Sequence, residues 1–153
     1  MKLPSDASAT LLNVLTARGV RLTRPRRAVV HVVTRLQRPV SVAEIHERLS
    51  GRDVNLGSVY RTIALFCRLD VMRLAASSRG TQRFELSERF IGHHHHLVCR
   101  TCGDVQDLDG CVLRKPVLAR LEQQIRRTTQ FQVMDHDLRL YGVCARCGPA
   151  GAS

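Results

Sequence analysis

The sequence contains no tryptophan, and aromatic residues occupy only 4% of its 153 positions. Apolar residues still make up 44%, so the sequence predicts a core built mainly from aliphatic side chains. No apolar run approaches the ~20 residues that a membrane-spanning helix requires. Residues 1–10 also lack the charged-then-apolar layout of a secretory signal peptide. These absences favour a cytoplasmic protein without a membrane partner, folded as one domain of ordinary size or two small ones.

Acidic residues are few as well, since 13 Asp and Glu stand against 24 Lys and Arg, for a formal net charge of +11. The excess lies in residues 1–90, which carry 16 basic against 7 acidic residues, whereas residues 91–153 carry 8 against 6. A basic segment favours a polyanionic partner such as DNA, because neutralising phosphates releases counterions. A solvated basic surface is the alternative, so charge alone does not decide between the two.

Neither an H-E-x-x-H motif nor a comparable catalytic motif occurs in the sequence. A metal-dependent hydrolase needs an open coordination position and a poised base in a pocket, so the sequence argues against an enzyme. Because no secretion signal is present, disulfide bonds are not expected among the six cysteines. Metal binding is the preferred interpretation of those cysteines.

The first 70 residues hold four helical patterns. Helix N-caps are expected at Thr23, Ser41 and Ser58, and Ser41 with the glutamate three residues later has the spacing of a capping box. Residues 71–75 and 82–86 then indicate two strands around a turn. Helices followed by a hairpin are the layout of a winged helix-turn-helix, whose last helix before the hairpin enters the major groove of DNA.

The pattern changes at residues 87–96, which are interpreted as a linker that leads into four consecutive histidines. The spacing of apolar residues after Pro116 predicts a helix, and short strands are expected at residues 96–99, 105–108 and 137–143. The predicted fold class is therefore α/β (α+β), in two domains. The predicted boundaries are 1–87 for the winged-helix domain with a hinge at about 87–93, 93–148 for the second domain, and 149–153 for a frayed tail.

Two Cys-x-x-Cys pairs form the strongest local signal in the second half. Each pair can chelate one ion through a tight knuckle, and a glycine after each second cysteine permits the turn. Four thiolates give the closed tetrahedral shell of a structural Zn²⁺. An iron–sulfur cluster is an alternative, and a redox pair is disfavoured because no βαβ pattern surrounds the cysteines. The predicted zinc ligands are Cys99, Cys102, Cys144 and Cys147.

Two cysteines stand outside these pairs. Cys67 lies on the apolar face of the fourth helical pattern and is expected to be a small buried hydrophobe. Cys111 follows Asp109 and Gly110, where it is an extra metal ligand, a reactive thiol or a residue without a role.

The four consecutive histidines, His93–His96, are the second signal. In extended backbone, alternate side chains point to opposite sides, so the second and fourth histidines would serve one metal ion and the first and third another. Glu85, Asp107 and His136 stand close to these histidines in the predicted arrangement. Two histidines with two carboxylates bind Zn²⁺, Fe²⁺ or Mn²⁺, so the ligand types do not settle the metal. A solvated histidine run is the alternative.

Tyr60 and Arg61 lie opposite the apolar stripe of the fourth helix, in its first turn, where base edges are usually read. Arginine can be bidentate to guanine, and tyrosine can meet a thymine methyl group or a phosphate. As isolated residues they would be ordinary surface groups, and only the winged-helix pattern favours a DNA contact. Three arginines at the start of the second helix are expected to contact phosphate: Arg24, Arg26 and Arg27.

The order of these motifs over about residues 10–148 resembles the ferric uptake regulator family. The matching segments are residues 19–26 (GVRLTRPR), 56–62 (LGSVYRT), 84–86 (FEL), 93–103 (HHHHLVCRTCG) and 140–147 (LYGVCARC). The resemblance implies a metal-dependent, DNA-binding transcriptional repressor of metal-uptake or homeostasis genes, of the zinc or iron type. It also implies a pseudo-palindromic operator of double-stranded DNA and a homodimer formed by a C-terminal α/β dimerisation domain.

The resemblance further assigns roles to single residues. It gives a structural Zn²⁺ to Cys99, Cys102, Cys144 and Cys147. It gives a regulatory hinge site, for Zn²⁺ or Fe²⁺ and also compatible with Mn²⁺, to Glu85, His94, His96 and Asp107. It gives a further metal site to His93, His95 and His136. It gives DNA contacts to Arg21, Ser58, Tyr60, Arg61 and Thr62, with Arg21 in the minor groove.

Three departures from the family pattern bear on the metal. Pro39 stands where iron and peroxide sensors often place a histidine, Ser87 where zinc sensors place a cysteine, and Ala119 where the further site usually has an acidic residue. The histidine run and the missing histidine favour zinc, whereas Glu85 and Ser87 favour iron or manganese. The alternatives are a manganese- or peroxide-responsive member of the family, and a zinc-ribbon binding module without metal sensing.

Overall fold

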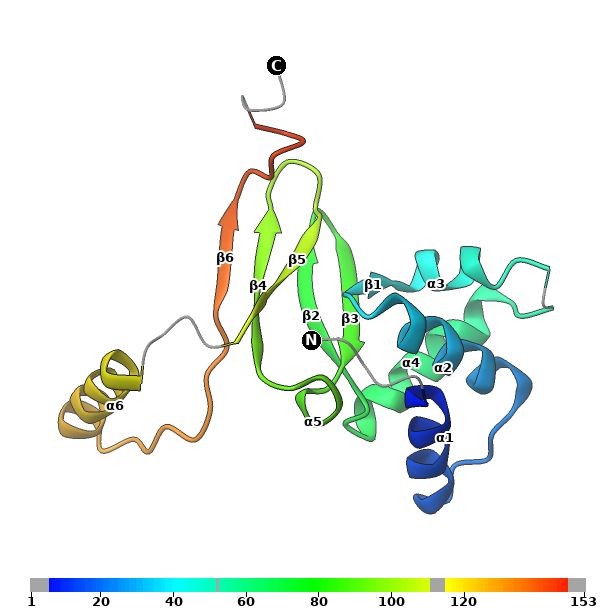
Figure 1. Ribbon diagram of the computed structural model, residues 1–153, viewed down its shortest axis with the longest axis horizontal. Helices are drawn as coiled ribbons and strands as arrows, with labels where there is room; N and C mark the ends of the chain where they lie inside the picture. Colours follow the sequence, from blue (N-terminus) through cyan, green and yellow to red (C-terminus); the bar gives the residue numbers. More distant parts are fainter. Residues whose placement is uncertain (1–5, 52, 111–114, 149–153) are drawn as a thin grey trace.

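The computed structural model of the protein describes residues 6–51, 53–110 and 115–148 (Figure 1). The elements in chain order are α1 (Ala7–Ala17), α2 (Arg24–Leu36), β1 (Val40–Ser41), α3 (Val42–Arg48), α4 (Leu56–Arg68), β2 (Met72–Ser78), β3 (Thr81–Leu86), α5 (Glu88–Ile91), β4 (His94–Cys99), β5 (Val105–Asp109), α6 (Lys115–Thr129) and β6 (Arg139–Gly142). Cys111 and the predicted tail at 149–153 lie outside the described residues. Within the described ranges, every helix is too short or too polar to cross a membrane.

The N-terminal half folds as the winged helix that its periodicity predicts. Helices α1 to α4 enclose an aliphatic core in which Leu15, Val29 and Phe66 have no exposed surface. A three-stranded antiparallel sheet, in the order β1-β3-β2, closes one side of the domain. Val40 of β1 pairs with Phe84 of β3. The sequence did not predict β1, because a strand of 2 residues is too short to show an alternating pattern.

Polar side chains fix the starts of two helices. Ser41 caps α3, because its Oγ accepts a hydrogen bond of 3.1 Å from the N–H of Glu44, as the capping-box spacing predicts. The prediction that Ser58 caps α4 is wrong. Asn55 is the N-cap, and its Oδ1 accepts a hydrogen bond of 2.8 Å from the N–H of Ser58. Thr23 occupies the N-cap position of α2, but among the described residues its hydroxyl receives no capping bond.

The hairpin of β2 and β3 is longer than predicted. Its paired residues reach Ser78 and Thr81, so only two residues remain in the turn. Those residues, Arg79 and Gly80, have φ angles of 51° and 76°. Positive φ at both positions is the geometry of a type I′ hairpin turn, which matches the twist of the flanking strands. The sequence predicts the turn at residues 77–80, but Ser77 and Ser78 belong to β2 and only Arg79 and Gly80 form the turn.

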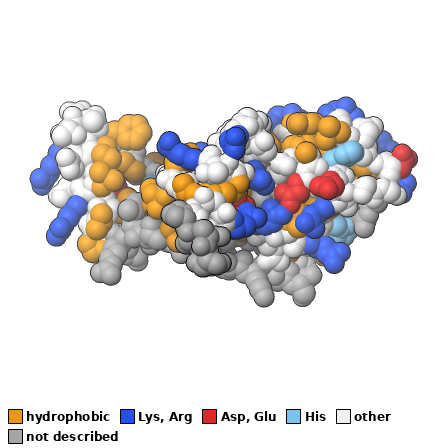
Figure 2. All heavy atoms as spheres, turned by 90° about the horizontal axis from the view of Figure 1, so that it is seen from above, with side chains coloured by type: hydrophobic (Ala, Val, Ile, Leu, Met, Phe, Trp, Pro, Cys, Tyr) orange, Lys and Arg blue, Asp and Glu red, His pale blue; other side chains and the backbone are white. Residues whose placement is uncertain are grey.

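The C-terminal half contains a second three-stranded sheet, in the order β5-β4-β6, in which β4 is antiparallel to β5 and parallel to β6. Helix α6 stands away from this sheet (Figure 1). On the predicted apolar stripe of α6, Val117 is 55% exposed and Leu121 is 48% exposed. Hydrophobic side chains gather on α6 and on the region beside it (Figure 2). The surface of a subunit interface is exposed when one chain is seen alone. The exposed apolar stripe of α6 is typical of such an interface.

The two halves meet along the wing, which is the hairpin formed by β2 and β3. Ala76, Val98 and Val105 form a small buried cluster between β2 and the C-terminal sheet. Arg83, in the middle of β3, donates a hydrogen bond of 3.2 Å from Nε to the carbonyl of Gly103. The wing therefore contacts both the middle of the second sheet and the knuckle between β4 and β5.

The segment at residues 87–96, predicted as a linker that leads into the histidines, is not irregular throughout. Its central residues form the single helical turn α5. Ser87, at the start of α5, donates a hydrogen bond of 2.9 Å from Oγ to the carbonyl of Asp70. Phe90 packs against the N-terminal core. The connection between the domains thus contains a helical turn that packs against the N-terminal core.

Candidate metal centres and DNA-facing helix

The two cysteine pairs meet because the strands that lead to them are neighbours. Cys99 at the end of β4 and Gly142 at the end of β6 are partners in the parallel ladder. The four sulfur atoms lie within 4.8 Å of one another, and Sγ of Cys102 is 3.7 Å from Sγ of Cys144. Zn–S bonds of about 2.3 Å in a tetrahedron place the sulfurs about 3.8 Å apart. The cluster therefore has the dimensions of a tetrahedral zinc site.

The thiols of this cluster ionise unequally. Hydrogen bonds from the backbone N–H groups of Cys102 and Cys144 lower the pKa of Cys99 to about 6. Hydrogen bonding to the sulfur atoms of Cys102 and Cys144 raises the pKa of Cys147 to about 12. Thiolates packed this closely repel one another, so only a cation between them lets all four ionise. The described cysteines form no disulfide, and this donor set fits Zn²⁺.

A second cluster joins the wing to the C-terminal sheet. Glu85 lies on β3, His94 and His96 lie on β4, and Asp107 lies on β5 directly opposite His96. Glu85 Oε2 is 3.0 Å from His94 Nε2 and 2.9 Å from His96 Nε2. His96 Nε2 is in turn 3.8 Å from Asp107 Oδ1. All four predicted hinge residues thus offer ligand atoms within 4.8 Å of one another, and Glu85 and both histidines are buried.

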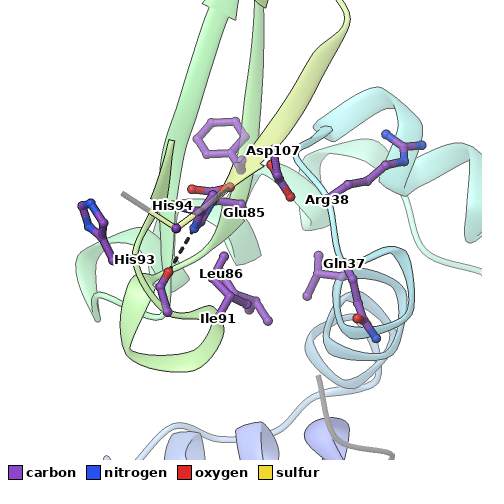
Figure 3. A pocket seen from close by; sticks show the side chains of 12 residues that line it. Gln37, Arg38, Glu85, Leu86, Ile91, His93, His94 and Asp107 are labelled. Carbon is purple, nitrogen blue, oxygen red and sulfur yellow. Dashed lines mark hydrogen bonds and ion pairs between the residues drawn. The ribbon is translucent and has the colours of Figure 1, made fainter. Parts of the chain in front are cut away.

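The hinge cluster borders a pocket of about 380 Å³ between the end of α2 and the C-terminal sheet (Figure 3). Glu85, His94 and Asp107 line the side toward the sheet, and Gln37 and Arg38 line the side toward α2. Among the described lining residues, those from α2 and the turn after it include neither a histidine nor a carboxylate. Among the residues that line this pocket, the N-terminal half therefore reaches the cluster through Glu85 of β3, which agrees with Pro39 standing before β1 in the sequence.

The hinge cluster shifts the pKa values of Glu85 and His94 in opposite directions. Burial acts to raise the pKa of Glu85, but hydrogen bonds with His94 and His96, together with one from Arg73, lower it to about 2. The hydrogen bond to Glu85 also raises the pKa of His94 to about 9, against the effect of burial. At neutral pH the metal-free cluster therefore holds an ionised Glu85 against a protonated His94.

We expect metal binding at the hinge cluster to tighten as the pH rises. A ligating histidine is neutral, so His94 must lose the proton that it holds up to its pKa of about 9. Because binding displaces one proton, each rise of one pH unit below that pKa should tighten metal binding roughly tenfold, for example from about pH 7 to pH 8. Chelator-competition titrations with Zn²⁺, on protein whose cysteine site is already filled, measure this dependence. A flat profile in that range would contradict the role given to the His94–Glu85 pair.

A third cluster lies on the other face of β4. Nitrogen atoms of His93, His95 and His136 lie within 4.8 Å of one another, and the ring of His93 is 4.7 Å from that of His95 and 4.6 Å from that of His136. His95 is completely buried, and neither of its ring nitrogens has a hydrogen-bond partner among the described residues. Buried polar atoms without partners are costly, so this cluster also fits a bound cation. The alternation predicted for the four histidines is confirmed.

Besides Asp135, sequence reasoning missed two residues at these clusters. Glu88 of α5 forms a further group of possible ligand atoms with His93 and Asp135. Arg73 of β2 makes ion pairs with both Glu85 and Glu88. Neither residue belongs to a recognisable motif. The position of Glu88 just before the histidines is the only sequence feature that could have drawn attention to it.

The first turns of α4 present polar side chains to solvent. Tyr60 is 57% exposed, and the exposed Arg61 donates from Nη2 to Ser58 Oγ at 3.1 Å. Gly57 leaves room for this arginine, since a Cβ there would lie 3.3 Å from Arg61 Nη1. Thr62 departs from its predicted role, because it is only 3% exposed and its hydroxyl donates to the carbonyl of Ser58. Burial thus removes Thr62 from the candidate DNA-facing surface.

Basic side chains also gather at the start of α2. Arg21 is exposed just before this helix, and its carbonyl accepts a hydrogen bond of 2.7 Å from Arg26. Arg24 and Arg27 line a cavity of about 500 Å³ together with Val54, which directly precedes the cap of α4. The basic start of α2 therefore lies beside the start of α4, where both can face one polyanion.

Comparison with known proteins gives a consistent result. The model of the ferric uptake regulator family matches residues 17–141. The ferric uptake regulation protein of Bacillus subtilis is 30% identical over 137 residues, which cover 87% of this chain and 89% of that protein. The peroxide-responsive repressor PerR of Staphylococcus epidermidis is 25% identical over 135 residues, covering 87% and 85% of the two chains.

Solved structures agree with these relatives. The crystal structure of the Vibrio cholerae ferric uptake regulator matches with a TM-score of 0.70 and 27% identity, covering 86% of this chain and 98% of that one. A zinc-bound manganese uptake regulator matches with a TM-score of 0.65 and 30% identity, covering 88% and 98% of the two chains. The similarity thus extends over both the winged helix and the C-terminal domain.

Proposed function

Because the chain belongs to the ferric uptake regulator family of metal-responsive transcriptional regulators, we propose that it is a homodimeric repressor that binds operator DNA once a regulatory metal ion is bound. Its proposed operators are pseudo-palindromic, and its proposed targets are genes of metal uptake or homeostasis. One observation carries this proposal. The hinge cluster takes Glu85 from the wing and its other three members from the C-terminal sheet, so a ligand held there would join the two halves.

The mechanism that we propose follows from the positions of these residues. Glu85 ends the hairpin that follows α4, whereas His94, His96 and Asp107 belong to the C-terminal sheet. When bound, a divalent cation supplies the charge and the coordination bonds that these four residues share. Side chains from both halves that hold one ion also hold one orientation of the winged helix. In a dimer that orientation sets the separation of the two α4 helices, which must match half-sites about one helical turn apart.

Each cluster is proposed to hold its own kind of ion. The cysteine cluster would hold a structural Zn²⁺, because its closed thiolate shell leaves no position for another ligand. The hinge cluster would hold the regulatory ion, Zn²⁺ or Fe²⁺, and its two carboxylates are also compatible with Mn²⁺. His93, His95 and His136 would form a further site. The proposed domains are residues 1–87 and 93–148, with the turn between them as the hinge.

A selection experiment tests the proposed function. A pool of random-sequence DNA duplexes is incubated with the purified protein and Zn²⁺, Fe²⁺ or Mn²⁺ in turn, and the bound duplexes are sequenced. We expect enrichment of a pseudo-palindromic sequence with the regulatory metal and no enrichment when only the cysteine site is filled. Equal enrichment with and without the added metal would contradict the proposal and favour a zinc-ribbon module without metal sensing.

A manganese- or peroxide-responsive regulator is the second candidate within the same family. The similarities to a peroxide-responsive repressor and to a manganese uptake regulator support this candidate. Exposing the Fe²⁺-loaded protein to hydrogen peroxide separates the possibilities. A peroxide sensor loses operator binding irreversibly, whereas a sensor of metal alone regains it when fresh metal is added.

Replacing Arg61 with alanine should weaken binding to the selected operator by about 1–3 kcal/mol, if this side chain reads a base edge. Arg61 is exposed in the first turns of α4, and its guanidinium lies over Ser58. Arg68→Ala is the matched control, because Arg68 is an exposed arginine at the other end of the same helix. Fluorescence anisotropy with the operator and with a scrambled duplex measures both variants. An Arg61→Ala variant with unchanged operator affinity would remove Arg61 from the contact surface.

A further inference from the structure

The hinge cluster and the histidine cluster on the other face of β4 are joined by one guanidinium. Arg73 Nε donates to Glu85 Oε1 at 2.7 Å, and Arg73 Nη1 donates to Glu88 Oε1 at 2.6 Å. The second oxygen of each carboxylate points to histidines. Glu85 Oε2 contacts two hinge histidines, and Glu88 Oε2 lies 3.4 Å from His93 Nδ1. Arg73 thus occupies one oxygen of each carboxylate and leaves the other oxygen directed at a cluster.

The fold fixes this arrangement from three elements. Arg73 on β2 is the cross-strand partner of Glu85 on β3, so their side chains share one face of the hairpin. Glu88 lies in α5, which follows β3 after Ser87, and its Oε1 accepts from the same guanidinium. A guanidinium presents its donors in a rigid planar fork, so one arginine can hold two carboxylates at a set angle. Glu85 is buried and Arg73 is only 29% exposed, so water competes little for these bonds.

The histidine cluster on its own lacks an anionic donor. His93, His95 and His136 together supply only neutral nitrogens to a divalent cation. Glu88 and Asp135 are the described carboxylates grouped with His93, in a set that shares this residue with the three-histidine cluster but does not include His95 or His136, and of these two Glu88 makes a hydrogen bond with the His93 ring. A carboxylate already oriented toward His93 is suited to complete the site.

We propose that Glu88 is the acidic ligand of the His93/His95/His136 site and that Arg73 is a positioning residue that orients the carboxylates of both metal sites. The inference rests on the proposed function, because it takes both clusters to bind metal. Partners that orient metal ligands typically contribute a factor of 10–100 to metal affinity. Since Arg73 contacts both carboxylates, its loss should weaken both sites together.

The experiment uses the full-length dimer with the cysteine site filled, and Co²⁺ as the probe metal. The His136→Ala background leaves the hinge site to be titrated, and the His96→Ala background leaves the histidine site. Arg73→Gln and Arg73→Lys are made in each background and followed by the absorption of bound Co²⁺. Arg89→Gln is the matched control, because Arg89 of α5 pairs with Asp70 and not with a predicted metal ligand. Zinc content and thermal melting without Co²⁺ verify the fold of each variant.

We expect both Arg73 variants to bind Co²⁺ about 10–100-fold more weakly in both backgrounds, with Arg89→Gln unchanged. Glu88→Gln should weaken binding only in the His96→Ala background. Arg73→Lys keeps the positive charge but not the fork, so full affinity in that variant would overturn the positioning role. Tighter binding in Arg73→Gln would overturn it as well, because the arginine would then act only by repelling the cation.

The two proposals fail in different ways. If the wild-type protein binds no Co²⁺ beyond its cysteine site, the proposed function and this inference both fail. If the wild-type protein binds Co²⁺ at both sites and the Arg73 variants bind it equally well, only this inference fails. If Arg73→Gln does not fold, Arg73→Lys decides, because lysine still supplies one hydrogen-bonding cation at that position.

Discussion

Replacing Cys144 with serine should remove the structural zinc and dissociate the dimer in one step. Four sulfurs within 4.8 Å of one another form a closed shell, and a single hydroxyl in place of a thiolate opens it. Structural zinc sites contribute on the order of 10 kcal/mol to the folding of small domains. That is the size of a whole domain's stability, so the C-terminal half should not fold without the ion.

Loss of the zinc ion should weaken the dimer through its effect on β6. Cys144 stands just beyond the end of this strand, and β6 is held in the C-terminal sheet by its pairing with β4. Leu140 and Tyr141 of β6 are 46% and 50% exposed, so β6 carries uncovered apolar surface of its own. Without the zinc knuckle, β6 should leave the sheet and take part of this surface with it.

Zinc analysis and sedimentation velocity measure the two effects on one sample. Cys67→Ala is the matched control, because Cys67 packs against the N-terminal core and lies outside the cluster. This control should keep its zinc and remain a dimer. A Cys144→Ser protein that is a stable, zinc-free dimer would contradict the structural role of the cluster.

Replacing His96 with alanine should abolish metal-stimulated DNA binding while the dimer and its structural zinc remain. His96 is 1% exposed and contacts both Glu85 and Asp107, so it lies at the centre of the proposed hinge site. Moving a two-state equilibrium from mostly open to mostly closed takes about 5.5 kcal/mol of differential binding. A site that loses its central ligand cannot supply that difference.

The comparison with His136→Ala identifies which site senses the metal. Operator binding of both variants is measured by fluorescence anisotropy over a series of metal concentrations. We expect His136→Ala to retain a metal response, because its site takes no ligand from β3. If His96→Ala keeps the normal metal dependence and His136→Ala loses it, the sensor is the His93/His95/His136 site and the hinge mechanism is wrong.

The metal clusters were predictable because their ligand types and spacings are local. Two Cys-x-x-Cys knuckles predict a tetrahedral site, and a run of histidines in a strand must alternate between two faces. Grouping Glu85, Asp107 and His136 with the histidines needed more than local spacing, and for these residues the family resemblance implies the site. The structure shows the reason, since β3, β4 and β5 bring the hinge residues to one point.

The features that escaped prediction depend on contacts between distant segments. Arg73 has no motif, and its role comes from the hairpin register and from the turn at α5. Asn55 replaced Ser58 as the cap of α4 because both are good capping residues and propensity does not separate them. Thr62 is buried because it lies three residues after Val59 and four before Phe66, so helical spacing places it on the packed side of α4, although the family resemblance assigns it to DNA.

In the proposed mechanism, metal at the hinge site and operator DNA favour the same conformation. Such coupling is reciprocal, so DNA must raise the metal affinity by the factor by which metal raises the DNA affinity. The direct measurement is a chelator-competition titration of the regulatory site with and without saturating operator duplex. We predict tighter metal binding in the presence of the operator, by the same factor that anisotropy gives for the operator with metal. A regulatory-site affinity that the operator leaves unchanged would contradict the account.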